Sequence, residues 1–383
     1  MAKKQISLFL GAFACLALIG GGCAVVEETP DDIISTDGEE VTEEAPIRIG
    51  WMGPLSGDLS SLGEDALAAA ELAVEEVNEA GGIDGRLLEL VAEDSRCNAK
   101  DATAAANKLI NIEGVKLING AACSPETTAV APIAEQNKVI VLSYCSSAPP
   151  ITDAGDYIFR SYPSDAFQGV FAANYIYNDL GKRKVAIMNT QDDWGIGLSG
   201  AFKNRFEELG GEITSKDEFT PDRKDFRSEL TKIKASDAEL VYFPGFTEAS
   251  IAALKQVTEL GIEKPFFGGD TWADTTIHES GLAEGITFVV PKTSLSDDFV
   301  SKMEARGANP TVCSPRAYDN IKLFASIIED VGTDTEKIKE ALYNTRNFEG
   351  VAGPISFDEN GDLTIAEYDV FRIEDGEQVM LTK

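Results

Sequence analysis

The chain has 383 residues, of which 43% are hydrophobic, so it is long enough to bury the cores of two or more domains. Its 33 basic and 65 acidic residues leave a net charge of −32. Because that charge repels nucleic acid and anionic lipid head groups, we expect no nucleic-acid partner and no binding to a membrane surface by charge.

The first residues are typical of an export signal. Two lysines precede an apolar run, Ile6–Ile19, which is shorter than the roughly 20 residues that a membrane-spanning helix needs. Small residues then lead to Cys23, as in a lipoprotein signal, although Gly20 stands where that pattern usually has Leu, Val or Ile. We predict a signal peptide over residues 1–22 and lipidation at Cys23. A cleaved secretory signal and an uncleaved anchor are the alternatives.

An acidic segment follows the proposed lipid site. From Ala24 to Ala45 the sequence contains no basic residue, and such a composition cannot bury enough apolar surface to fold. Residues 23–45 are therefore predicted to be a lipid-anchored linker, disordered along its length.

Export places the other cysteines where disulfides persist. With Cys15 in the signal and Cys23 as the lipid site, four cysteines remain, and four permit three pairings. These four are Cys97, Cys123, Cys145 and Cys313. No Cys-x-x-Cys occurs, and His278, the only histidine, is expected on the surface of a helix, so we predict no metal site.

From Arg48 onward, short β-rich runs alternate with amphipathic runs, a pattern that predicts parallel sheets covered by helices. The predicted strands are 47–52, 87–94, 115–120, 138–144, 184–190, 238–245, 265–270 and 286–290. The predicted helices are Glu64–Asn78, Lys100–Ile112, Pro125–Gln136, Phe167–Asp179, Leu198–Leu209, Arg223–Ile233, Glu248–Leu260, Thr271–Glu279, Asp297–Ala305, Arg316–Asp330 and Thr335–Tyr343. A hairpin is predicted in "GPISFDENGDL", on a turn at Asn360-Gly361. So many strands need at least two sheets, with a boundary in Arg160–Gly169, where Pro and polar residues interrupt the pattern.

One short stretch, "GAACSPETTAVAP" (Gly120–Pro132), combines helix-start residues with donors. Ser124 is a preferred N-cap residue and Pro125 suits the first helical position. A helix start presents unpaired N–H groups and the positive end of the helix dipole, so this spot can bind a carboxylate or phosphate. Taken alone, Ser124 has the ordinary interpretation of a cap, because caps far outnumber ligand sites.

Motifs for catalysis and for cofactors are missing. The sequence has no Gly-x-Ser-x-Gly elbow, no Walker loop and no Gly-x-Gly-x-x-Gly after a strand. We therefore predict no catalytic residues and no cofactor.

The chain from about Pro46 onward resembles the extracytoplasmic substrate-binding proteins of ABC transporters for branched-chain amino acids, the leucine/isoleucine/valine-binding type. The segments that carry the resemblance are, in order, "GPLSGDLSSLGEDALAAAELAVEEVNEAGGIDGRLLELVAEDSRC", "INGAACSPETTAVAPIAEQNKVIVLSYCSSAPPIT", "FRSYPSDAFQG", "DDWGIGL", "VYFPGF", "GGDTW" and "GPISFDENGDL". The resemblance implies a type I periplasmic binding fold, an α/β fold in which two doubly wound parallel-sheet lobes, joined by a three-crossover hinge, close on the ligand. It implies lobe 1 over 46–164 plus 291–365 and lobe 2 over 165–290 plus 366–383, without enzymatic activity.

The resemblance also assigns a carboxylate site. In the family, a serine after the second disulfide cysteine holds the ligand's carboxylate, and Ser124 matches it. The loop after the next strand completes the cradle for carboxylate and ammonium. There Ser147 supplies a hydroxyl, where many relatives have Thr, and Cys145 supplies its carbonyl.

For the ligand's ammonium, the family uses a carboxylate at a strand end in the second lobe. Asp270 of "FFGGD" matches that position, where relatives of the leucine type have Glu. Asp is one methylene shorter, so the ammonium must approach more closely or the lobes must close further. As an alternative, Asp270 only caps the helix that follows it.

The resemblance places apolar side chains around the rest of the ligand. Trp194 and Phe246 align with family tyrosines beside the ligand's backbone, although Trp194 also suits core packing. Leu62 stands where relatives place an aromatic over the side chain, which opens space for a bulky apolar ligand such as leucine or phenylalanine. Tyr162 and Trp272 are expected on the same wall.

Cys97 and Cys123 match the family's disulfide pair, and closing that loop stabilises the fold by roughly 3 kcal/mol in chain-entropy terms. Cys145 and Cys313 have no counterpart in the usual pattern. A second disulfide between them, near the cleft, is our hypothesis.

These observations predict an extracytoplasmic binding protein that delivers a free amino acid, hydrophobic or branched-chain, to the permease subunits of an ABC importer. Its membrane contact would be the lipid anchor alone. The alternatives are a binding protein for another small solute such as urea, an amide or an aromatic acid, a sensor with the same fold, and an enzyme on a doubly wound fold. Asp270 favours a ligand that carries an amine.

Overall fold

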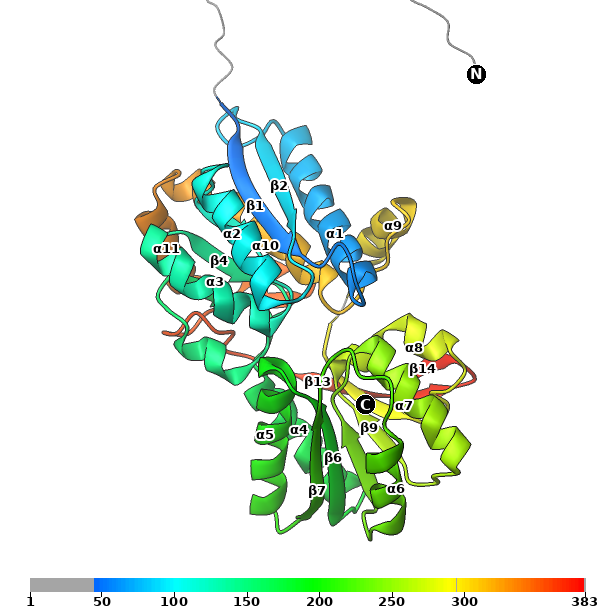
Figure 1. Ribbon diagram of the computed structural model, residues 1–383. Helices are drawn as coiled ribbons and strands as arrows, with labels where there is room; N and C mark the ends of the chain where they lie inside the picture. Colours follow the sequence, from blue (N-terminus) through cyan, green and yellow to red (C-terminus); the bar gives the residue numbers. More distant parts are fainter. Residues whose placement is uncertain (1–44, 294, 382–383) are drawn as a thin grey trace, which may run out of the picture. The chain divides into compact units, whose positions relative to one another are not determined.

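The computed structural model describes residues 45–293 and 295–381, which are organised around two large sheets (Figure 1). The predicted signal peptide, Cys23 and nearly all of the acidic linker lie outside the described residues. Among the helices of the described residues, none combines the length and the apolar character needed to cross a membrane.

The first sheet is entirely parallel, in the order β2-β1-β3-β4-β5. Its strands are β1 (Ile47–Gly53), β2 (Leu88–Asp94), β3 (Leu117–Asn119), β4 (Ile140–Ser143) and β5 (Ile158–Arg160). Parallel neighbours need crossover connections, and α1 (Ser60–Glu79), α2 (Ala99–Asn111) and α3 (Ser124–Asn137) supply three of them. The helix α1 packs over the sheet face that carries Trp51 and Leu142, while α2 and α3 cover the face that carries Ile118 and Val141.

The second sheet has the order β14-β13-β10-β9-β8-β6-β7. It comprises β6 (Lys184–Thr190), β7 (Glu212–Phe219), β8 (Leu240–Phe243), β9 (Phe266–Gly268), β10 (Thr287–Pro291), β13 (Tyr368–Glu374) and β14 (Glu377–Met380). Five strands are parallel, and β13 and β14 add an antiparallel edge next to β10. The helices of this part are α4 (Asp165–Asn174) with a π-helical turn at Tyr175–Asp179, α5 (Asp193–Glu208), α6 (Arg227–Ala235), α7 (Thr247–Leu260), a 3₁₀ turn at Asp270–Ala273 and α8 (Thr275–Glu279).

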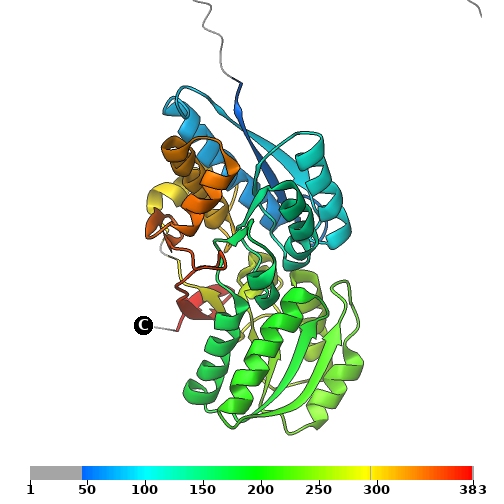
Figure 2. The same ribbon diagram turned by 90° about the vertical axis from the view of Figure 1, so that its left-hand side faces the viewer.

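The chain passes between the two sheets three times: after β5, after β10 and before β13. Between the second and third passages lie α9 (Asp297–Ala305), α10 (Ser314–Val331), α11 (Thr335–Tyr343) and a small sheet of β11 (Phe348–Gly350) and β12 (Gly353–Ile355). The helix α10 packs against α1, and Figure 2 shows α10 and α11, in orange, on the same lobe as the blue first strand. This topology confirms the predicted fold class, two doubly wound α/β lobes with three crossovers. The residue boundaries of the lobes stay a prediction.

A buried ion pair ties the first passage to the third. Arg160, at the end of β5, is 0% exposed, and its Nε and Nη2 donate to Oδ1 and Oδ2 of Asp362 at 2.6 Å each. Its Nη1 donates to the carbonyl of Ala148 at 2.8 Å, and Thr152 Oγ1 donates to Asp362 Oδ2 at 2.7 Å. Since this network satisfies both charges away from water, removing one partner leaves the other buried and unpaired.

The eight predicted strands all exist, but four strands of the large sheets were not predicted. β5 is only three residues long, and β7 is a half-exposed edge strand rich in charged residues, so neither has an apolar pattern. β13 and β14 form the antiparallel edge. The predicted hairpin is reduced to a single bridge, Phe357–Leu363, around a turn in which Gly361 has φ +79°.

Two helix predictions need correction. The predicted helix Thr271–Glu279 is broken at Asp274, whose extended backbone and side chain cap α8 by accepting the N–H of Thr276. His278 is not on the surface. It is 5% exposed because its ring packs against Phe288 and its Nε2 hydrogen bonds with the carbonyl of Trp272 at 2.7 Å.

Truncating one partner of the Arg160–Asp362 pair should lower the stability of the fold strongly. Replacing Asp362→Ala should lower the free energy of unfolding by about 3–5 kcal/mol, because the Arg160 guanidinium stays buried without its partner. Glu207→Ala, which removes the exposed pair with Lys203 on α5, is the matched control and should cost less than about 1 kcal/mol. Urea denaturation followed by circular dichroism measures both, and equal costs would contradict the role given to the buried pair.

Candidate binding cleft

All eight predicted ligand-binding residues follow the carboxyl end of a strand. In parallel α/β sheets such ends lie at one edge, where ligands bind. The positions are Leu62 after β1, Ser124 after β3, Cys145 and Ser147 after β4, Tyr162 after β5, Trp194 after β6, Phe246 after β8 and Asp270 after β9. The first five follow strands of the first sheet and the last three follow strands of the second.

A cavity of about 230 Å³ lies between these two sets of strand ends. Seven of the eight predicted residues line it: Leu62, Ser124, Cys145, Ser147, Trp194, Phe246 and Asp270. Tyr162, which was also predicted to contact the ligand, does not line the cavity; it is buried, and its hydroxyl donates to Asp270. Trp272 is also absent from the lining, since it packs into the core against Phe243.

The start of α3 carries a hydroxyl with an available proton. The sequence suggested Ser124 as the N-cap of α3, but the structure differs. Cys123 holds that position, and Glu126 accepts its N–H at 2.8 Å. The Ser124 Oγ instead accepts the N–H groups of Ser147, at 3.2 Å, and Ala148, at 3.1 Å. Because both lone pairs are occupied, Ser124 can only donate, next to a helix start that favours an anion.

Ser147 is held in the opposite sense. Its hydroxyl donates to Asp165 Oδ2 at 2.9 Å, and its carbonyl accepts the N–H of Asp165 at 2.7 Å. The Ser147 oxygen therefore keeps lone pairs that can accept from a cation. The other carboxyl oxygen of Asp165, Oδ1, is buried and has no hydrogen-bond partner among the described residues. Burial, and then the charge of Asp270, hold the pKa of Asp165 well above its usual range.

Asp270 is a buried carboxylate held by two donors. It is 5% exposed, and it accepts from the hydroxyl of Tyr162 at 2.6 Å and from the N–H of Thr271 at 3.0 Å. Burial raises the pKa of Asp270, while these hydrogen bonds oppose the shift. No lysine, arginine or histidine of the described residues lines the cavity. The site thus carries negative charge that a bound cation would stabilise.

Apolar side chains also line the cavity. Trp194 and Phe246 stack with ring centroids 4.9 Å apart, and both line the cavity, so Trp194 packs in the core and faces the site at once. Leu62 and Val312 add aliphatic surface from the other side of the cleft.

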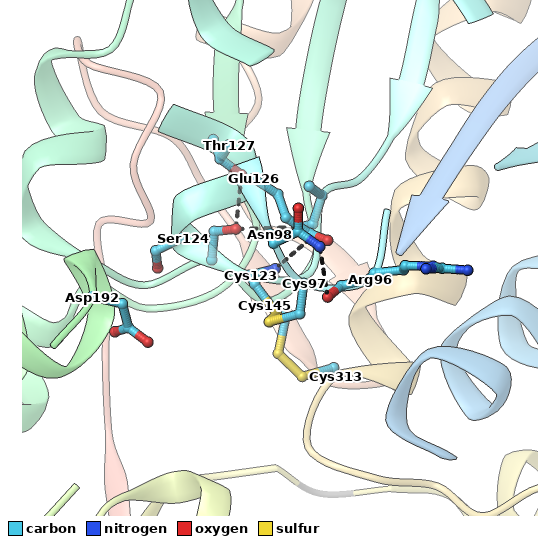
Figure 3. Close-up of a disulfide and its surroundings, with 12 residues drawn as sticks. Arg96, Cys97, Asn98, Cys123, Ser124, Glu126, Thr127, Cys145, Asp192 and Cys313 are labelled. Atoms are coloured by element: carbon cyan, nitrogen blue, oxygen red, sulfur yellow. Dashed lines mark hydrogen bonds between the residues drawn. A yellow bond between two sulfur atoms is a disulfide. The ribbon is translucent and has the colours of Figure 1, made fainter. Parts of the chain in front are cut away.

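Two disulfides lie beside the start of α3 (Figure 3). Cys97 pairs with Cys123, as the resemblance implied, and Cys145 pairs with Cys313, which confirms the hypothesis of a second disulfide. The second one joins positions 168 residues apart and lines the cavity. It holds the loop before α10 against the loop that carries Ser147.

Several lining residues were not predicted from the sequence, notably Asp65, Asp274, Thr311 and Val312. Asp65 lies three residues after Leu62, so the helical period alone places both on one face of α1. Thr311 and Val312 could be predicted in the cleft only if Cys313, the next residue, was assumed to pair with Cys145. Among the described residues, no group of three metal-ligating side chains occurs.

A family model described as "Periplasmic binding protein" matches residues 46–378. The chain is 30% identical over 334 residues to the leucine-, isoleucine-, valine-, threonine- and alanine-binding protein of Pseudomonas aeruginosa, covering 85% of this chain and 89% of that protein. A solved leucine-binding protein from Thermotoga maritima superposes with a TM-score of 0.81 at 29% identity, over 88% of this chain and 98% of that one. The isoleucine complex of a branched-chain amino acid transporter substrate-binding protein from Streptococcus pneumoniae gives a TM-score of 0.80 at 28% identity, over 88% and 99%.

The two lobes and the cavity at their strand ends define a solute-binding protein. The chain belongs to the periplasmic binding protein family, which the match over most of its length shows. This is a family of binding proteins for small molecules, not of enzymes, and it acts outside the cytoplasm.

The buried carboxyl of Glu126 should make the free energy of unfolding depend on pH. Its carboxyl is fully buried at the start of α3, and burial raises its pKa from 4.5 to about 7. Between these two values the folded chain keeps a proton that the unfolded chain releases. Rising pH therefore lowers the free energy of unfolding through this group, by at most about 3 kcal/mol.

Glu126→Gln keeps an oxygen for the Cys123 N–H but cannot ionise. The free energy of unfolding of this variant, relative to wild type, should therefore rise between pH 5 and pH 7.5 in urea denaturation. Glu263→Gln, at an exposed position, is the control and should show no such trend. Parallel pH profiles for wild type and Glu126→Gln would show that Glu126 stays ionised in the folded chain.

Proposed function

We propose that this protein is the extracytoplasmic amino-acid-binding component of an ABC importer. Its ligand would be a free α-amino acid that enters between the two lobes and is enclosed when they close about the hinge. The observation that carries the proposal is one cavity with a donor end at Ser124 and an anionic end at Asp270. A zwitterion is the ligand that satisfies both ends.

The hydrogen bonds of the lining residues indicate which of them would bind the ligand's α-carboxylate and which its α-ammonium. Ser124 and the start of α3 would donate to the ligand's carboxylate, since the hydroxyl has only its proton left to share. Asp270, the hydroxyl oxygen of Ser147 and the carbonyl of Cys145 would accept from the ammonium. Tyr162 would act indirectly, because its hydroxyl orients the carboxylate of Asp270.

The apolar surfaces support a ligand with a hydrophobic side chain. Trp194 and Phe246 flank the main-chain site, and Leu62 leaves room where an aromatic ring would close it. The names of the relatives point the same way: one is named for binding leucine, isoleucine, valine, threonine and alanine, one for binding leucine, and one was solved with isoleucine.

The proposal extends to partners and location. The closed form would dock on the permease subunits of the importer, and a lipid on Cys23 would hold the protein at the outer face of the membrane through the acidic linker. The lobes would divide at 46–164 plus 291–365 and 165–290 plus 366–383, consistent with the strand order of the two sheets.

Calorimetric titration tests the proposal. Refolded mature protein, residues 24–383, is titrated with the twenty amino acids, urea, acetamide and benzoate, because refolding removes any captured ligand. At least one amino acid should bind. Ser124→Ala should weaken its binding about tenfold or more, because a donor to a carboxylate is lost. Asp270→Asn should weaken it roughly 30-fold or more, because the ammonium loses its counter-charge.

Two surface changes are the matched controls. Ser301→Ala and Asp84→Asn alter exposed residues that do not line the cavity and should leave affinity unchanged within about twofold. Binding of urea, acetamide or benzoate in place of amino acids would overturn the amino-acid assignment. So would amino-acid binding that is indifferent to Asp270→Asn.

A further inference from the structure

The part of the cavity away from Ser124 is acidic. Besides Asp270, the lining includes two more carboxylates, Asp65 from α1 and Asp274 from the other side of the cleft. Among the described residues that line the cavity there is no basic side chain to balance them. A neutral zwitterion leaves this excess of negative charge unchanged, whereas a ligand with a second cation reduces it.

Asp65 is buried with half of its acceptor capacity unused. It is 8% exposed, and its Oδ1 accepts the N–H of Asn309 at 2.8 Å. Its Oδ2 has no hydrogen-bond partner in residues 45–293 and 295–381, although the residue lines the cavity. This oxygen is therefore free to accept a hydrogen bond from a ligand in the cavity.

The opposite wall carries a further carboxylate. Asp274 is fully engaged, since its Oδ1 caps α8 and its Oδ2 accepts from the Thr247 hydroxyl at 2.6 Å. Burial raises the pKa of Asp65, and the charges of Glu64 and Asp274 add to the shift. Closure of the cleft would bring Asp65 and Asp274 together, and a cation between them would remove their repulsion.

Apolar side chains lie in the same lining as these carboxylates. Leu59 and Leu62 precede Asp65 in the chain, and Ala273 and Val312 line the cavity from other segments. Such surfaces pack against methylene groups and leave a terminal charge to the carboxylates. The lining therefore matches an aliphatic stem that ends in an ammonium.

We propose that Asp65 determines specificity within the amino-acid class, and that it shifts the preference from a purely hydrophobic side chain to an aliphatic stem that ends in a second ammonium, of the length of ornithine or lysine. This inference rests on the proposed function, because it assumes that the α-carboxylate and α-ammonium bind at Ser124 and Asp270. The ε- or δ-ammonium then donates to Asp65 Oδ2, with Asp274 nearby.

Lysine and norleucine form a matched pair of probes, since they share the stem and differ in the terminal ammonium. In calorimetric titration of wild type, lysine should bind at least about tenfold more tightly than norleucine. Asp65→Asn, which keeps an oxygen for the Asn309 N–H, should remove most of that preference and leave norleucine within about twofold. Asp84→Asn, an exposed change on a positive-φ turn that Asn tolerates, is the control and should preserve the preference.

Tighter binding of norleucine or leucine than of lysine in wild type would overturn the inference and leave the proposed function standing. Binding of benzoate or urea but of no amino acid would overturn both. If Asp65→Asn fails to fold, the wild-type comparison still decides, and it has a second readout. Lowering the pH protonates Asp65 and should weaken lysine binding more than norleucine binding, whereas equal weakening would count against the role of Asp65.

Discussion

The constraint on which the binding site depends is the burial of a carboxylate without a cation. Asp270 is held out of water by Tyr162 and Thr271, and a second buried carboxyl, Asp165, lies close enough to raise the cost of charge on both. Protein chains avoid such arrangements unless a ligand, a metal or a partner completes them. Here the cavity stands open beside Asp270, and the opposite end offers the Ser124 hydroxyl and a helix start. The two ends together require a ligand that carries both charges.

The fold brings these ends together through a few long-range links. Parallel strands bring their carboxyl ends to one edge of each sheet, so residues spread from Leu62 to Asp270 meet in one cleft. The Arg160–Asp362 pair fixes two of the three passages between the lobes, and the Cys145–Cys313 disulfide holds the loop before α10 against the cradle for the ligand's main chain. These two links hold the loops around Ser124 and Ser147 in place, so hinge closure would leave that side of the cleft unchanged.

Much of this could be predicted from the sequence, for physical reasons. Buried strands such as β4 and β8 carry apolar runs that are visible without a structure, whereas β7 is an edge strand rich in charged residues and gives no such signal. The family resemblance, not the helix start alone, assigned Ser124 to the ligand's carboxylate, and its hydroxyl accepts backbone N–H groups from a loop over 20 residues away in the chain. No local pattern encodes that contact. Tyr162 and Trp272 were misplaced because an aromatic beside a site looks the same in sequence whether it faces the cavity or lies behind it. Asp65 and Asp274 became meaningful only when the cleft brought them face to face.

A crystal structure of the mature protein with a bound amino acid would show directly how the ligand is held. We expect one orientation: the α-carboxylate within hydrogen-bonding distance of the Ser124 hydroxyl and the start of α3, and the α-ammonium against Asp270, with both lobes in contact with the ligand. A ligand bound in the reverse orientation, or outside the cavity between the strand ends, would contradict this expectation. So would an ammonium held by other groups while Asp270 remains bonded only to Tyr162 and Thr271.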